Sequence, residues 1–174
     1  MWRSTLTNVE LHPMRPEEVE ELVRITRDTG FFYPEEVEVA REVLLEAAQN
    51  GEASRYRVHV AALGQQALGY VCFGPTPLTR GTWDVYWIAV APQRQRQGVG
   101  VRLVRLAEEE ILLQGGRLVL VETSSRNLYE PTRRFYRDLG YQEVSCIPDF
   151  YDVGDGRVTL AKVLSHGGGH TMPP

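Results

Sequence analysis

Apolar residues along the chain follow helical spacing in some segments and strand-like alternation in others. Two early segments have helical spacing, one between Pro16 and Gly30 and one over residues 34–50. Alternation of apolar and polar residues over 55–63 then predicts a half-exposed strand, and a first strand is expected within residues 4–11. The early part of the chain therefore predicts two helices placed between strands.

The middle of the chain predicts a hairpin followed by a crossover. Residues 67–73 return as the second strand of the hairpin, and residues 74–77, Gly-Pro-Thr-Pro, are expected to form a loop because they cannot continue a ladder. A strand over 82–90 is apolar on both faces, and a helix to about Gln114 and a strand over 117–122 follow it. A strand, a helix and a strand in this order predict a parallel pair.

The last part of the chain predicts a short helix and two strands. The helix covers residues 130–139, and strands are expected over 141–147 and 157–164, joined by a loop over 148–156. Residues 165–174 contain three glycines and two prolines and are expected to be a disordered tail.

These elements predict the fold class. We expect an α/β (α+β) fold with a mixed, mostly antiparallel central sheet of about six or seven strands and helices on both faces. A doubly wound nucleotide fold would need regular alternation of strands and helices, which residues 55–90 lack. A single domain is expected over residues 1–164.

Charge and composition argue against several classes of protein. The 174-residue chain has a net charge of −4, which disfavours a general role in binding nucleic acid. We see no signal peptide and no apolar run of the roughly 20 residues that a membrane span needs. Cys72 and Cys146 lie in apolar strand-like runs and are expected to be buried free thiols. We therefore expect a cytoplasmic protein without nucleic-acid or membrane partners.

The junction between the strand over 82–90 and the following helix has the features of an anion site. Pro92 ends the strand, and Gly98 and Gly100 open the helix. The first turn of a helix has unpaired N–H groups and partial positive charge, and glycines let phosphates approach the backbone. A dinucleotide fingerprint would need glycine at Leu103, and a nucleotide-triphosphate loop would need Gly-Lys-Ser/Thr, so neither pattern fits.

Two short motifs stand in order along the chain. Residues 90–100 read Val-x-Pro-x-x-Gln-x-x-Gly-x-Gly, and Phe135-Tyr136 is followed by Gly140-Tyr141. In both motifs the chain resembles the GNAT superfamily, the N-acetyltransferases that use acetyl-coenzyme A. The order of elements from about residue 4 to residue 164 also agrees, so the resemblance covers nearly the whole chain.

The resemblance implies where the co-substrate, acetyl-coenzyme A, binds. Backbone N–H groups of residues 96–101 are expected to hold its pyrophosphate, and the backbone of residues 88–90 is expected to pair with its pantetheine arm. Arg94, Arg96 and Arg102 are either additional phosphate partners or ordinary surface charge. The residues expected at the coenzyme are Ile88, Ala89, Val90, Gln95, Arg96, Gln97, Gly98, Val99, Gly100 and Val101.

The resemblance also implies catalytic residues. Members of the family use a tyrosine to protonate the departing thiolate, and Tyr136 stands at the matching place, where the alternative is a core aromatic. A carboxylate must take a proton from the amine, and Glu122 and Asp84 are the candidates. The alternative for either is an ion pair with an arginine. The helix start departs from the family pattern, because Tyr129 and Thr132 stand where many members have asparagine and a small residue.

Aromatic residues in two predicted loops are candidates for the acceptor site. Phe31 and Phe32 lie where the family builds its variable substrate wall, and Tyr151 is expected to close the site from the other side. The alternative is that these side chains only cover helix ends. The four histidines are scattered and make no ligand set, so no metal is predicted.

The function expected from this resemblance is acetyl transfer. We expect an acyltransferase that moves an acetyl group from acetyl-coenzyme A to a primary amine of a small molecule or protein, by direct attack in a ternary complex. The alternative is a non-catalytic acyl-coenzyme A-binding or sensing module with the same fold, but such a module would need neither Tyr136 nor the two carboxylates. The acceptor and the length of the acyl group stay open, and a homodimer is expected only because family members commonly form one.

Overall fold

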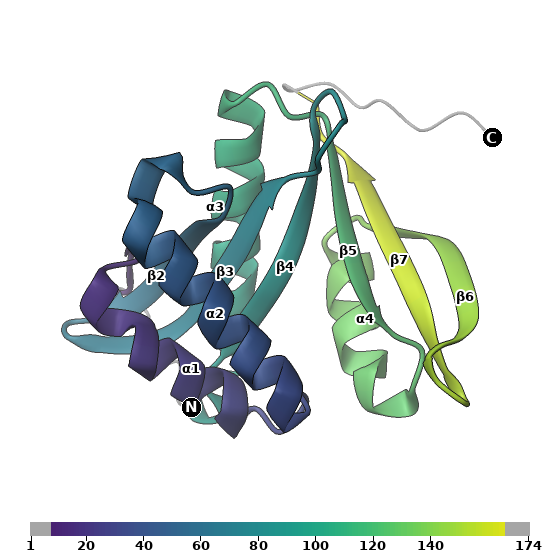
Figure 1. The fold of residues 1–174 in the computed structure, drawn as a ribbon, viewed down its shortest axis with the longest axis horizontal. Helices are drawn as coiled ribbons and strands as arrows, with labels where there is room; N and C mark the ends of the chain where they lie inside the picture. Colours follow the sequence, from purple (N-terminus) through teal and green to yellow (C-terminus); the bar gives the residue numbers. More distant parts are fainter. Residues whose placement is uncertain (1–7, 166–174) are drawn as a thin grey trace, which may run out of the picture. The chain divides into compact units, whose positions relative to one another are not determined.

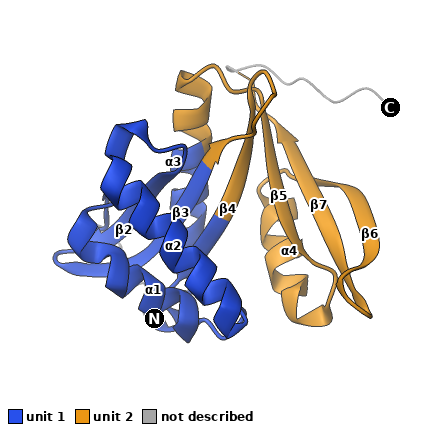
Figure 2. Ribbon diagram, viewed as in Figure 1, with its two compact units in different colours: residues 1–73, 87–107 blue, residues 74–86, 108–174 orange. Residues whose placement is uncertain are grey.

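The computed structural model describes residues 8–165 of the chain. The chain divides into two compact units, which Figure 2 shows in different colours. Unit 1 takes the residues up to 73 together with 87–107, and unit 2 takes 74–86 together with the residues from 108 onward. Each unit therefore combines segments that are separated in the sequence.

Unit 1 contains an antiparallel group of strands. β1 (Glu10–Pro13) pairs with β2 (Arg57–Leu63), and β2 pairs with β3 (Gln66–Pro75). The turn between β2 and β3 contains Gly64, whose φ of +60° suits glycine. The hairpin that the sequence predicts is therefore present.

Helices cover both faces of the strands of unit 1 (Figure 1). α1 (Val19–Asp28) and α2 (Pro34–Asn50) lie on one face, and α3 (Val99–Leu113) begins on the other. Thr26 of α1 hydrogen-bonds the Tyr70 hydroxyl of β3 at 2.7 Å, and both residues are buried. This bond satisfies two polar groups in the core and joins α1 to β3.

Unit 2 contains the parallel pair. β4 (Thr82–Val90) pairs in parallel with β5 (Leu118–Ser124) over Thr82–Val85, as the strand–helix–strand pattern predicts. β7 (Asp155–Val163) is antiparallel to β5 and to β6 (Gln142–Asp152). α4 (Glu130–Asp138) precedes β6 and contacts it.

The strand order is β1-β2-β3-β4-β5-β7-β6. The predicted mixed α/β sheet with six or seven strands is therefore confirmed, with seven strands. β4 is the middle strand, in agreement with its apolar character on both faces.

Proline and glycine set several helix ends where the sequence predicts them. α2 begins at Pro34 and is followed by Gly51, whose φ is +52°. α3 ends just before Gly115, whose φ is +76°. The predicted first strand lies at Glu10–Pro13, so it is shifted along the chain, and residues 4–7 of that prediction lie outside the described residues. The predicted tail also lies outside them, apart from Ser165.

The two predicted proline loops are wrong in part. β3 continues to Pro75, and β6 continues through the predicted loop to Asp152, so that only a short turn precedes β7. Pro148 is tolerated because β6 is the last strand in the order, where a missing N–H removes no bond to a further strand. The β6–β7 register shifts between Ile147 and Asp152, and Asp149 has a φ of +52°.

The cysteine prediction holds for one of the two residues. Cys72 on β3 is buried and free, whereas Cys146 on β6 is free but exposed. The prediction failed at Cys146 because it lies on β6, the last strand in the order, where every residue is exposed.

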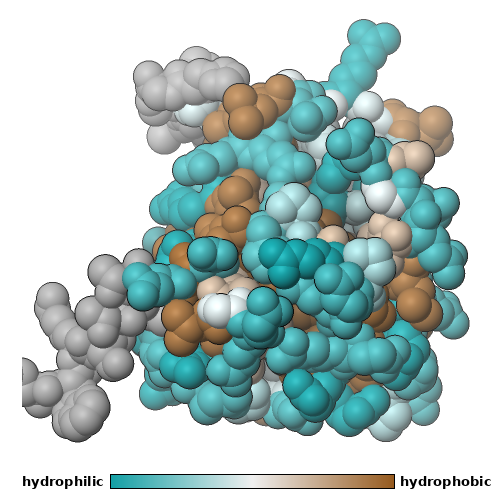
Figure 3. Space-filling view, turned by 90° about the vertical axis from the view of Figure 1, so that its left-hand side faces the viewer, coloured by the Kyte–Doolittle hydropathy of each residue, from teal (hydrophilic) through white to brown (hydrophobic). Residues whose placement is uncertain are grey.

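No helix among residues 8–165 is long and apolar enough to cross a membrane. On the face drawn in Figure 3, hydrophobic side chains form separate patches among hydrophilic ones.

A buried ion pair joins α3 to β7 within unit 2. Lys162 Nζ lies 2.8 Å and 2.9 Å from the two carboxylate oxygens of Glu108, and the Glu108 side chain is only 7% exposed. The same ammonium lies 5.4 Å from the ring centre of Tyr141. Removing one member of such a pair leaves the other charge in a poorly solvated place.

We predict that Lys162→Met lowers the free energy of unfolding by about 3 kcal/mol, as is usual when a buried ion pair loses one partner. The double variant Glu108→Leu/Lys162→Met should recover most of this loss, because no buried charge is then left behind. Urea denaturation measures both. Arg134→Gln is the control, since Arg134 and Asp138 are exposed and 4.0 Å apart. Equal losses in the single and double variants would contradict the prediction.

Candidate active site

The loop between β4 and α3 is held by its own amide side chains. A short 3-10 turn covers Pro92–Arg94. Gln95 Nε2 donates to the Val90 carbonyl at 3.2 Å, and Gln97 Nε2 donates to the Gln93 carbonyl at 2.9 Å. The two glutamine side chains therefore bind loop carbonyls, so donors toward a ligand must come from backbone N–H groups at the start of α3 and from arginine side chains.

These backbone donors lie at the start of α3. The Arg102 N–H donates to the Gly98 carbonyl at 3.1 Å as the first bond of the helical ladder, so the N–H groups of residues 99–101 precede the ladder. Gly98 is exposed with a φ of +85°, and a Cβ added there would meet nothing within 4 Å. An N-terminus with open space in front of it suits an anion such as a phosphate.

The arginines of this segment differ in their surroundings. Arg102 donates from Nη2 to the Val9 carbonyl at 2.8 Å, which makes it a link to the chain before β1. Arg96 is exposed with a φ of +59°. The Nε–H of Arg94 is buried and has no hydrogen-bond partner among the described residues. A buried donor without a partner is costly, so Arg94 is the arginine whose surroundings best suit a bound anion.

In the second half of β4, the backbone N–H and C=O groups of every other residue point toward β3. The Ala91 N–H donates to the Leu68 carbonyl at 2.8 Å. Backbone groups of successive strand residues point to opposite sides, so those of Ala89 also face β3, whereas those of Ile88 and Val90 face away from it. The sequence-based expectation treated Ile88, Ala89 and Val90 alike, but only two of the three point away from β3.

Tyr136 lies in the core of unit 2. Its side chain is buried and packs edge-to-face against Phe135 and Tyr141, with ring centres 5.1 Å and 5.2 Å apart. Burial raises the pKa of the Tyr136 phenol well above its usual range. The hydroxyl therefore stays protonated at neutral pH, as a proton donor must, but its surroundings are also those of a core aromatic.

The two candidate carboxylates lie on one face of unit 2. Asp84 stands opposite Leu120 in the parallel ladder, and Glu122 follows two residues later on β5, so both point to the same face. Asp84 is half-buried and accepts a 2.6 Å hydrogen bond from Thr76 Oγ1. Glu122 is exposed, and its Oε1 lies 3.5 Å from Nη1 of Arg157.

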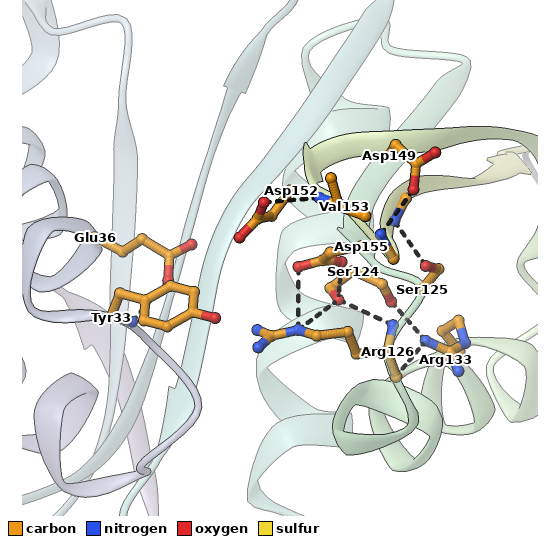
Figure 4. A network of polar contacts seen from close by, with 12 residues as sticks. Tyr33, Glu36, Ser124, Ser125, Arg126, Arg133, Asp149, Asp152, Val153 and Asp155 are labelled. Carbon is orange, nitrogen blue, oxygen red and sulfur yellow. Dashed lines mark hydrogen bonds and ion pairs between the residues drawn. The ribbon is translucent and has the colours of Figure 1, made fainter.

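A polar network joins the end of β5 to the start of β7 (Figure 4). Ser124 Oγ donates to Asp155 Oδ1 at 2.5 Å, and Arg126 Nε lies 3.0 Å from Asp155 Oδ2. Arg133 of α4 donates to the carbonyls of Ser124 at 2.5 Å and Arg126 at 3.1 Å. Because Asp155 and Arg133 are buried, this network fixes the segment between β5 and α4.

The aromatic candidates for the acceptor site belong to different units. Phe31 and Phe32 lie in the connection between α1 and α2 in unit 1, and Phe32 lines a small pocket with Arg27, Pro34, Val37 and Glu38. Tyr151 lies in unit 2 on β6 rather than in a loop, half-exposed and edge-to-face against Phe150 at 5.0 Å.

Comparison with protein-family models assigns the chain to a family. A family model described as an acetyltransferase (GNAT) domain matches residues 54–143, which is more than half of the chain. The chain belongs to the GNAT acetyltransferase family. The protein is accordingly an acetyltransferase. A comparison with curated proteins gives no significant match.

Solved structures agree with this assignment. A GNAT-family protein from Desulfovibrio desulfuricans is 39% identical over 89% of this chain and 98% of its own, with a TM-score of 0.86. An aminoglycoside 6′-N-acetyltransferase solved with coenzyme A (19% identity, 91% and 99% coverage, TM-score 0.71) shares the fold. The ribosomal-protein-S18-alanine N-acetyltransferase of Escherichia coli also shares the fold, with 18% identity over 94% of this chain and 99% of its own and a TM-score of 0.71. At such identities these two support the GNAT fold and nothing finer.

Sequence reasoning about this GNAT protein missed the polar residues on β7. Asp155 and Arg157 are two residues apart and lie on the same face. Asp155 falls in the segment predicted as a loop, whereas Arg157 is the first residue of the strand predicted over 157–164, and neither was named as a site residue. The alternation of these two residues with Gly156 and Val158 is the signal that could have extended the predicted strand to Asp155.

We predict that the protein loses stability as the pH rises above about 10, because the unfolded chain then releases phenol protons that the folded chain keeps. Burial raises the pKa of both Tyr136 and Tyr70. Each of these two tyrosines should therefore lower the free energy of unfolding by about 1.4 kcal/mol for every unit by which the pH rises in this range. Tyr136→Phe should remove one such contribution, which urea denaturation at several pH values measures. Below about pH 8 the variant and the wild type should show the same pH dependence, and an unchanged slope above pH 10 would contradict the prediction.

Proposed function

We propose that this acetyltransferase transfers an acetyl group from acetyl-coenzyme A to a primary amine of a small molecule or protein, by direct attack of the amine in a ternary complex. The observation that carries the proposal is the junction of β4 with α3, where N–H groups without helical partners directly follow Gly98, and the space beside Gly98 is open. The family assignment narrows the phosphate ligand of such a junction to a coenzyme A thioester.

The residues of the junction fit the coenzyme. The N–H groups of residues 99–101 would bind the pyrophosphate, with the buried Nε–H of Arg94 as a further donor. The backbone of Ile88 and Val90 would bind the pantetheine arm, since these residues face away from β3. Gln95 and Gln97 would support the loop from behind, because their amides are already bonded to it.

The chemistry needs one proton donor and one proton acceptor. When the amine nitrogen attacks the thioester carbonyl, the carbon–sulfur bond breaks, and Tyr136 would give its proton to the departing sulfur. A carboxylate would take a proton from the amine. The two transfers balance, so the products are the amide and the free thiol.

Glu122 suits the role of base better than Asp84. Asp84 is half-buried and already accepts a short bond from Thr76, which fixes its carboxylate. Glu122 is exposed on the same face and has a longer contact to Arg157. An amine can reach Glu122 without displacing a tight hydrogen bond.

The acceptor is proposed only as a class. Two structural neighbours carry names that refer to an aminoglycoside and to a ribosomal protein, so the GNAT fold serves both small-molecule and protein acceptors. Phe31, Phe32 and Tyr151 stay proposals for acceptor contacts. A homodimer is also only a proposal, supported by the exposed edge strand β6.

We predict that Gly98→Ala weakens coenzyme A binding at least tenfold, because its Cβ would occupy the space through which the phosphates approach. Gly64→Ala is the matched control, since Gly64 also has a positive φ and open space around it but lies in the β2–β3 turn. Calorimetric titration with coenzyme A measures both affinities. Equal affinities of the two variants would remove the coenzyme from this loop.

We predict that Tyr136→Phe lowers kcat by about 100-fold, the typical effect of losing a general acid, while the affinity for coenzyme A stays unchanged. Release of thiol from acetyl-coenzyme A in the presence of amines measures the rate. A melting curve controls for folding, because the buried ring is retained in phenylalanine. Wild-type turnover in a folded variant would leave Tyr136 as a core aromatic only.

A further inference from the structure

Arg157 is an incompletely bound cation on the face of unit 2 that carries Glu122. Its Nη1 lies 3.5 Å from Glu122 Oε1, longer than the roughly 2.8 Å of a tight charge-assisted hydrogen bond. Its Nε–H is buried and has no hydrogen-bond partner among the described residues. A guanidinium that leaves a buried donor unbonded can gain a carboxylate ligand at little cost.

The position of Arg157 is set by strands and an aromatic ring. It stands opposite Ser124 in the β5–β7 ladder, and Glu122 is two residues along β5 on the same face. The guanidinium carbon lies 4.2 Å from the ring centre of Phe150, which is half-exposed. Phe150 therefore covers one side of the guanidinium plane, while 27% of the Arg157 side chain stays exposed to an approaching anion.

The neighbouring Arg126 shows the opposite situation. Its Nε lies 3.0 Å from the buried carboxylate of Asp155 and 3.3 Å from Ser124 Oγ, and its guanidinium stacks over Tyr129. Arg126 thus belongs to the internal network, and a ligand would have to compete with a buried carboxylate for it. On this face Arg157 is the arginine that is suited to a ligand.

We propose that the acceptor is an α-amino acid, held by Arg157 through its carboxylate and by Glu122 through its amine. An α-amino acid carries an ammonium and a carboxylate on one carbon, and Glu122 and Arg157 present the complementary pair of charges side by side. Binding replaces the 3.5 Å contact between the two residues by two contacts to the ligand, each between opposite charges. This proposal rests on the N-acetyltransferase activity proposed above and names its substrate class.

The reaction balances without a further reactant. Glu122 takes one proton from the ammonium, the neutral amine nitrogen forms a bond to the acetyl carbon, and the carbon–sulfur bond breaks. Tyr136 gives a proton to the sulfur, and the second proton that the nitrogen loses replaces it. The products are an N-acetyl amino acid, coenzyme A and the proton held by Glu122. The carboxylate of the amino acid takes no part in the chemistry and serves only to position the amine beside Glu122.

The test compares acceptors that differ only in the carboxylate. L-phenylalanine and L-alanine are each compared with their amides and with the corresponding decarboxylated amines, by thiol release from acetyl-coenzyme A. The amide is the sharper comparison, because it keeps the size of the acid and loses only its charge. We expect kcat/KM to be roughly 10- to 100-fold higher for the acids, as is typical of a charge-assisted hydrogen-bonded pair.

Variants assign this preference to Arg157. Arg157→Gln should abolish the difference between acid and amide, and Arg157→Lys should restore only part of it, because lysine cannot bind a carboxylate in a bidentate way. Arg134→Gln removes an exposed, loosely paired arginine of α4 and should keep the full preference. Calorimetric titration of L-phenylalanine into the protein with coenzyme A should show binding that Arg157→Gln loses.

The outcomes separate this proposal from the activity on which it rests. If amides and decarboxylated amines are acetylated as well as the acids, amine acetylation stands and the amino-acid proposal is overturned. An acid preference that survives in Arg157→Gln overturns the role of Arg157. If no amine of the panel gives thiol release while coenzyme A still binds, the proposed activity itself fails.

Discussion

The N–H groups at the start of α3 have no carbonyl partners within the helix, and the proposed binding of the coenzyme depends on these groups. The loop before α3 could have satisfied these groups with side-chain caps, but Gln95 and Gln97 donate to loop carbonyls instead. Glutamine amides thus fix the loop, and the backbone is left to bind an anion. The open space beside Gly98 makes that backbone accessible.

β4 has two roles along its length, and its sequence suits both. Over Thr82–Val85 it forms the parallel pair with β5, where Trp83 and Val85 are buried. Over its second half it pairs with β3 and turns the backbone groups of Ile88 and Val90 away from that strand. Both roles use backbone groups, which each of these residues carries whatever its side chain.

The sequence predicted those parts of the structure that local signals determine. Proline at the start of α2 and glycines after α2 and α3 act within a few residues, so these helix ends were predictable. The extent of β6 was not, because Pro148 breaks a central strand but not the edge strand of this sheet. The loop that is proposed to bind the coenzyme was predicted from its motif. An arginine partner was anticipated as the alternative role of Glu122, but Arg157 was not identified as that partner, because the contact depends on the register of two strands that are distant in sequence.

The same dependence on register would give the proposed acceptor site of Glu122 and Arg157 a well-defined geometry. Both project from hydrogen-bonded strands of unit 2, so the spacing of the two charges is fixed by the ladder rather than by a loop. Phe150 lies in the irregular part of β6, where the register with β7 shifts and Asp149 adopts a positive φ. The strands would thus fix the amine and the carboxylate of the acceptor, whereas the irregular segment would contact the group that varies between amino acids. Specificity for the shared part of the acceptor would then rest on rigid strands, and tolerance toward the side chain would rest on β6.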